Sequence, residues 1–187
     1  MSPPRPRRST AQLIEAYDGT LDALRRSFEQ LEYAVALFHP DLDVQAFATA
    51  WGSDDPSERN RAAGVLANFE KTYMLLMDLI TLSVKIASRL GAHEADEQTS
   101  AIACLREEEV ISQETQDALD DQRKVRNASQ HVYVELSISA LRDAVHTQLK
   151  TTPAAIRAIG AWVSTFEGVQ EERQGLRPRA ARSKKAG

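Results

Sequence analysis

The side chains best suited to chemistry lie together in residues 123–133, which include Arg123, Lys124, Arg126, Asn127, His131 and Tyr133. Arginine presents a fixed fork of donors to phosphate oxygens and stays charged. Histidine titrates near neutrality, so it can take a proton from a ribose hydroxyl or give one to a leaving oxygen. Because RNA supplies its own nucleophile, the 2′-hydroxyl, such a pair needs neither a metal ion nor a protein nucleophile. The stretch therefore suits phosphodiester chemistry, with Asn127 orienting the imidazole or the phosphate.

Helical spacing restricts how these groups can meet. Asn127 and His131 are four positions apart and share a face. Arg126 and His131 are five apart, which is roughly 140° around a helix of ~3.6 residues per turn. Their functional groups converge only through the reach of arginine, a local break, or a pocket shared with another surface. This geometry favours a cleft between helices or between two copies of the chain; the alternative is a plain helix surface with a few hydrogen bonds.

Helical periodicity dominates the first half of the chain. Apolar residues recur every three or four positions over 10–38, a first helix that Thr10 would cap. The pair His39-Pro40 predicts its end, because the residue before proline avoids the helical region. A short helical segment is expected within 42–51. The loop GSDDPSE then opens a long helix with an aspartate cap and an early proline, and Gly91 ends it.

The second half continues the same pattern. Thr99 or Ser100 opens a short helix, and the pair Thr152-Pro153 opens a last helix that runs to Phe166. Between them, Ser112 caps another long helix whose buried stripe is expected at Leu119, Val125, Ala128, Val132 and Leu136. No alternating strand pattern and no glycine-rich phosphate loop is found. The sequence therefore predicts an all-α fold, an up-and-down bundle of four to five helices.

Basic and acidic residues are distributed unevenly along the chain. Residues 1–9 carry three arginines and no acid, and residues 173–187 carry six basic side chains and no acid. The remainder holds fourteen basic side chains against all 27 acidic ones. Because both ends lack apolar periodicity, we expect disordered basic tails at 1–9 and 171–187 around one bundle at 10–170. Such tails serve for solubility or make loose contacts with nucleic-acid phosphates.

Several classes of site are excluded or unsupported. One cysteine allows no internal disulfide and no cysteine zinc cage, and no nucleotide-loop, serine-hydrolase or zinc-protease motif is present. The stretch HEADE at 93–97 has ligand-type residues but no second histidine, so neither a metal nor a cofactor is expected. No apolar run is long enough to span a membrane, and no secretory signal follows the first arginines. We therefore expect no membrane association and a cytoplasmic location.

The run Arg126-Asn127, three residues, then His131-Val132-Tyr133 resembles the R-x4-H-x-Y signature of HEPN domains, the higher eukaryote and prokaryote nucleotide-binding superfamily. Residues 68–73 (NFEKTY) resemble the RFE-x-Tyr-like motif of the branch of HEPN toxins that pair with a nucleotidyltransferase, with Asn68 where that branch often has arginine. The stretches FEQLEYAVALF and AIACLREEEVISQETQDALDDQRKVRN resemble the same family. The resemblance covers roughly residues 20–150.

The resemblance implies the toxin of a type VII-like toxin–antitoxin pair, a metal-independent endoribonuclease that acts as a homodimer. By this likeness Arg126 binds and stabilises the phosphate, and His131 is the general acid and base. Asn127 would support the imidazole or the phosphate through polar contacts, and Arg123 and Lys124 would contact the RNA.

Tyr133 resembles the tyrosine that a cognate minimal nucleotidyltransferase antitoxin modifies with AMP. Bulk and negative charge at that position would repel RNA. An alternative function is a non-catalytic subunit that binds nucleotide or substrate for a two-component nucleotidyltransferase, and a third is a helical dimerisation module. Phe69 and Tyr73 are expected in the core, and Glu70 receives no catalytic role.

Overall fold

The computed structural model describes residues 9–38, 42–91, 100–130 and 137–182. Over these residues the chain forms seven helices and no strand, which confirms the predicted all-α helical bundle. No helix in these ranges is both long and apolar enough to cross a membrane.

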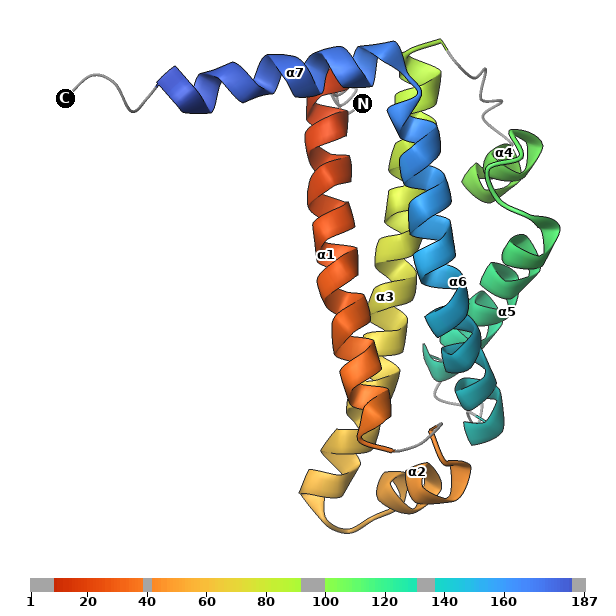
Figure 1. The fold of residues 1–187 in the computed structure, drawn as a ribbon. Helices are drawn as coiled ribbons and strands as arrows, with labels where there is room; N and C mark the ends of the chain where they lie inside the picture. Colours follow the sequence, from red (N-terminus) through yellow and green to blue (C-terminus); the bar gives the residue numbers. More distant parts are fainter. Residues whose placement is uncertain (1–8, 39–41, 92–99, 131–136, 183–187) are drawn as a thin grey trace, which may run out of the picture.

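Four long helices make the body of the bundle. Helices α1 (Thr10–Ala36), α3 (Pro56–Arg89) and α6 (Ile138–Ser164) run side by side, and α5 (Gln113–Gln130) packs along α6 (Figure 1). Of these pairs, α1 and α3 make the most extensive contact. The candidate site lies where α5 approaches α3.

Three shorter helices cover the two ends. Helix α2 (Val44–Trp51) lies at the end where α1 stops and α3 starts, and α7 (Glu167–Arg182) crosses the opposite end (Figure 1). Helix α4 (Ala101–Glu107) packs against α3 and leads into α5.

Side-chain caps fix the helix ends. Ser9 and Gln12 form a capping box, with the Ser9 N–H donating to Gln12 Oε1 at 2.9 Å and the Gln12 N–H donating to Ser9 Oγ at 3.2 Å. The cap thus lies one residue before the predicted Thr10. Asp55 caps α3, as predicted. Gly91 follows the end of α3 with φ +69°, a conformation that is strained for a residue with a Cβ atom.

The prediction that a last helix begins at Thr152-Pro153 was wrong. Pro153 lies inside α6, whose cap is Ser137, which accepts a backbone N–H at 3.3 Å. An interior proline removes one backbone donor and ordinarily costs about 3 kcal/mol. Here Val145 and Ile159, on either side of Pro153, are both 0% exposed, so burial of the flanking turns offsets that cost.

The helix predicted from Ser112 is present as α5, and its cap is confirmed, since the Thr115 N–H donates to Ser112 Oγ at 3.1 Å. Its predicted stripe is buried at Leu119 and half-buried at Val125 and Ala128. The remaining predicted stripe residues, Val132 and Leu136, lie outside the described residues, and so does the His39-Pro40 pair.

Helix α7 corrects the expected boundary at residue 170. Val169 is 0% exposed in the core, and Arg173 Nη2 donates to Asp18 Oδ1 at 2.6 Å, so these two contacts hold the start of α7 against the rest of the bundle. Residues 171–182 belong to this helix rather than to a disordered tail. Residues 1–8 and 183–187 lie outside the described residues.

Two apolar clusters fill the interior. One is built around Ile14, Leu24, Leu76, Leu105 and Ile159, and the other around Leu31, Phe47, Phe69, Leu141 and Val145. Along α1, α3 and α6 the residues between the two clusters are buried and polar, namely Ser27, Thr72, Gln148 and Thr152.

This polar layer is held by hydrogen bonds between helices. Ser27 Oγ and Thr72 Oγ1 are 2.9 Å apart and share one hydrogen bond between α1 and α3. Gln148 Nε2 on α6 donates to the carbonyl of Phe69 on α3 at 3.2 Å. Because a buried polar group is costly without a partner, these bonds set how the three helices align along their length.

Candidate functional site

Arg126 lies near the end of α5 and points toward α3. Its Nη2 donates to Met74 Sδ at 3.9 Å, and its Nε is buried with no hydrogen-bond partner among the described residues. The side chain is half-buried, and no described carboxylate lies within ion-pair distance of it. A guanidinium in this condition favours an anion, and a phosphate offers two oxygens that match its fork of donors.

Arg123 and Lys124 differ from Arg126 because each is exposed and paired. Arg123 Nη2 lies 3.0 Å from Asp120 Oδ1, and Lys124 Nζ lies 2.7 Å from Asp121 Oδ1. The hydrogen bond to Asp121 raises the pKa of Lys124. Exposed pairs of this kind are weak, so both cations remain able to exchange their carboxylate partner for another anion.

Tyr73 on α3 lies beside these basic residues. Tyr73 is 6% exposed, and this burial raises the pKa of its phenol. Smaller electrostatic effects come from Arg123 and Arg126, which lower the pKa, and from Asp120, which raises it. The expected core positions of Tyr73 and of Phe69, which is 0% exposed, are confirmed. The 68–73 motif on α3 and the basic stretch on α5 therefore lie against each other.

A hydrogen bond joins the same two helices one turn further along α5. The Ser129 hydroxyl donates to the carboxylate of Glu70, and it also lies 2.7 Å from the carbonyl of Arg126. Glu70 is half-buried, so its carboxylate is partly shielded from water. This contact fixes the last turn of α5, immediately before residue 131.

Gln122 fixes the preceding turn to α6. It is 0% exposed, one turn before Arg126, and its Nε2 donates to Thr151 Oγ1 at 3.2 Å. Arg126 is thus carried by a stretch of helix that is held on one side by α3 and on the other by α6.

Of the other candidate residues from the sequence, the structure describes Asn127 but not His131 or Tyr133. Asn127 is exposed. His131 and Tyr133 lie outside the described residues, so the meeting of Arg126 with His131 stays a prediction.

Three residues of this site had no assigned role in the sequence analysis: Glu70, Met74 and Ser129. The sequence could have indicated Glu70 and Met74, because they share a helix face with Tyr73 at spacings i, i+3 and i+4. Ser129 had no such signal, since nothing local indicates a partner on α3.

Metal and thiol chemistry find no support among the described residues. No group of three or more His, Cys, Asp or Glu side chains there could hold a metal ion, and the stretch 93–97 lies outside those ranges. Cys104 is buried, and burial raises the pKa of its thiol to about 11, which makes the thiolate scarce at neutral pH.

No protein-family model, no curated protein and no solved structure matches this chain.

Proposed function

We propose that this protein is a metal-independent endoribonuclease in which Arg126 and His131 act on one phosphodiester link of RNA. The reaction is an internal transfer. The ribose 2′-oxygen attacks the adjacent phosphorus and its proton goes to His131, while the bond from phosphorus to the 5′-oxygen breaks. The 5′-oxygen takes a proton from the protonated imidazole of the second copy's His131, and the products end in a 2′,3′-cyclic phosphate and a 5′-hydroxyl.

The observation that carries the proposal is the state of Arg126. Its guanidinium is half-buried and has no described carboxylate partner, in contrast to the neighbouring Arg123 and Lys124. Negative charge grows on the phosphate oxygens in the transition state, and a fixed, partly desolvated cation stabilises that charge strongly. Asn127, next along the helix, supports the phosphate or the imidazole.

Two copies of the chain complete the site in this proposal. A homodimer that brings Arg126 and His131 of both chains to one cleft doubles the positive charge of Arg123, Lys124 and Arg126 there. Local charge of this kind offsets the acidic body of the protein as RNA approaches.

A minimal nucleotidyltransferase is the proposed antitoxin, with Tyr133 as the acceptor of AMP. The added phosphate places negative charge two residues from the imidazole and repels the RNA backbone. The pair is thus a toxin with an enzyme that inactivates it, of the type VII kind.

The test is expression of the wild-type chain beside Arg126→Ala and His131→Ala. We expect growth arrest and RNA cleavage with EDTA present for the wild type, and neither for the variants. Loss of cleavage on adding EDTA would contradict the metal-independent mechanism. A harmless wild-type protein that still binds nucleotide would favour the alternative, a non-catalytic subunit of a two-component nucleotidyltransferase.

Tyr133→Phe tests the partner separately. Mass spectrometry after co-expression with a nucleotidyltransferase encoded next to this gene should find AMP on the wild-type chain and none on Tyr133→Phe. Undiminished AMP incorporation in the variant would reject Tyr133 as the modified residue.

A further inference from the structure

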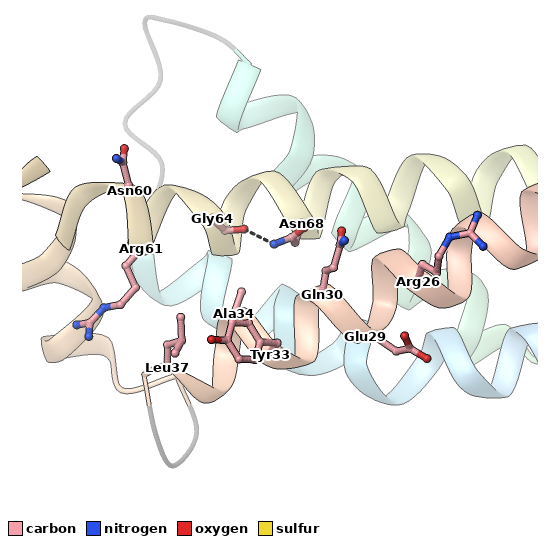
Figure 2. A pocket seen from close by; sticks show the side chains of 10 residues that line it. All are labelled: Arg26, Glu29, Gln30, Tyr33, Ala34, Leu37, Asn60, Arg61, Gly64 and Asn68. Atoms are coloured by element: carbon pink, nitrogen blue, oxygen red, sulfur yellow. Dashed lines mark hydrogen bonds between the residues drawn. The ribbon is translucent and has the colours of Figure 1, made fainter. Parts of the chain in front are cut away.

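A groove of about 560 Å³ runs between α1 and α3, away from the Arg126 site. One wall is apolar and comes from α1 and its C-cap: Tyr33 on α1 is 70% exposed, and the cap residue Leu37 is 43% exposed. The other lining residues include two amide side chains, Gln30 on α1 and Asn68 on α3 (Figure 2). The groove therefore offers an aromatic face next to groups that donate and accept hydrogen bonds.

Gly64 on α3 is one of the residues that line the groove. A Cβ atom at this position would meet nothing within 4 Å, so the absent side chain leaves open space. Asn68 Nδ2 donates to the Gly64 carbonyl at 2.9 Å, which holds the amide in place and leaves its oxygen available as an acceptor. A glycine within a helix costs about 1 kcal/mol relative to alanine, and a methyl group at Gly64 would occupy open space on the groove side of α3.

Two arginines lie at opposite ends of the groove, Arg26 on α1 and Arg61 on α3 (Figure 2). Arg26 is exposed and has no ion pair with a described residue. Arg61 pairs with Glu58 at 2.7 Å, yet its Nε is buried without a partner among the described residues. Glu29 is the one acid among the residues that line the groove, and Arg61 is paired with Glu58 and lies over the Phe38 ring, 4.5 Å from its centroid. Arg26 is therefore the lining cation without a described partner.

We propose that this groove binds a base of single-stranded RNA. Exposed bases of single strands stack on aromatic side chains and are hydrogen-bonded along their edges by polar groups. Tyr33 supplies the stacking face, Gln30 and Asn68 contact the base edge, and Arg26 and Arg61 contact the phosphates on either side. An acidic protein segment would use the two arginines but would leave the ring and the amides without a role.

The inference rests on the proposed function only in taking RNA as the ligand, and the two sites lie on one helix. Asn68 in the groove and Met74 beside Arg126 are six positions apart on α3, which is about 9 Å along the helix axis. Lys71 is exposed between them, as is Met74. Asn68 and Met74 are also roughly 120° apart around α3, so a strand held in the groove would pass over Lys71 and curve around α3 to bring its next links to Arg126.

The test measures RNA binding without cleavage. Full-length His131→Ala protein is titrated against a fluorescein-labelled single-stranded RNA of about ten nucleotides, with anisotropy as the readout. Adding Tyr33→Ala should weaken binding about tenfold, as expected for loss of one base stack, whereas Tyr33→Phe should bind as the parent does. Because Tyr33 is largely exposed, neither change should alter folding, which circular dichroism checks.

Arg26→Ala has a matched control in Arg25→Ala, which removes the same charge from the adjacent residue, one that pairs with Asp22 and does not line the groove. Arg26→Ala should weaken binding several-fold more than Arg25→Ala. Binding that is unchanged by Tyr33→Ala and Arg26→Ala, or no binding of RNA by the parent, would overturn the inference. If the wild type binds RNA through Tyr33 but does not cleave it, the inference that the groove binds RNA is supported and the ribonuclease proposal fails.

Discussion

The hydroxyl of Ser129 on α5 donates a hydrogen bond to the carboxylate of Glu70 on α3, linking residues 59 positions apart. The same hydroxyl lies 2.7 Å from the carbonyl of Arg126. One side chain thus ties the last turn of α5, which carries Arg126, to the long central helix.

Removing this tie should loosen the site. Ser129→Ala leaves the half-buried Glu70 carboxylate without its donor, so we expect the free energy of unfolding to fall by about 1–2 kcal/mol and RNA cleavage to fall with it. Urea denaturation and a cleavage assay measure the two effects. Glu70→Gln keeps an acceptor oxygen and should be milder than Glu70→Ala; equal losses for these two would contradict the role of the hydrogen bond.

The buried polar layer predicts opposite effects for two similar substitutions. Thr152 Oγ1 is buried without a partner among the described residues, whereas Thr72 Oγ1 bonds Ser27 Oγ. Thr152→Val should raise the free energy of unfolding by about 1 kcal/mol, because it removes an unpaired polar group. Thr72→Val should lower it by about 1–2 kcal/mol, because it leaves Ser27 unpaired. Changes of the same sign in urea denaturation would contradict this account of the layer.

Comparing Gly64→Ala with Gly19→Ala distinguishes an effect on helix stability from an effect on RNA binding in the groove. A Cβ atom at Gly64 or at Gly19 meets nothing within 4 Å, so either change to alanine should stabilise the protein by about 1 kcal/mol. Only Gly64 lines the groove. Gly64→Ala should therefore weaken RNA binding and Gly19→Ala should not, as anisotropy would measure; parent-like binding by Gly64→Ala would show that the groove floor is not used.

Stability should decline at alkaline pH. Burial raises the pKa of the Cys104 thiol from 9.0 to about 11, with smaller contributions from Glu108 and Glu107. Burial likewise raises the pKa of Tyr17. The folded state then holds protons that the unfolded chain releases, so this stability is complete below pH ~9 and is lost as the pH rises toward 11.

The expected loss between pH ~9 and ~11 is on the order of 2 kcal/mol, measured by urea denaturation across that range. Cys104→Ala removes the thiol and should give a shallower decline. An identical pH slope in the variant would show that Cys104 does not contribute.

Local signals predicted helix ends well. Asp55, Ser112 and Gly91 act where the sequence predicts, because capping needs only neighbours within one turn. The interior proline of α6 could not be anticipated, since what overrides it is the burial of Val145 and Ile159 against other helices.

Contacts between distant residues limited the prediction in two further places. Helix α7 extends beyond residue 170, and its Arg173 pairs with Asp18 on α1, 155 residues earlier in the chain. The candidate residues on α5 are recognisable from their chemical types, but Glu70 joins the site only through the packing of α3 against α5. Sequence spacing indicates which residues share a face, and the tertiary fold decides what that face meets.

The central claim is that Arg126 stabilises the transition state of RNA cleavage. The most direct measurement is single-turnover cleavage of a single-stranded RNA in EDTA by purified wild type, Arg126→Ala, Arg126→Lys and Arg123→Ala, with melting temperatures to confirm folding. We predict a rate constant about 10²–10³ lower for Arg126→Ala, an intermediate loss for Arg126→Lys, and mainly weaker binding for Arg123→Ala. Cleavage by folded Arg126→Ala at the wild-type rate would contradict the claim.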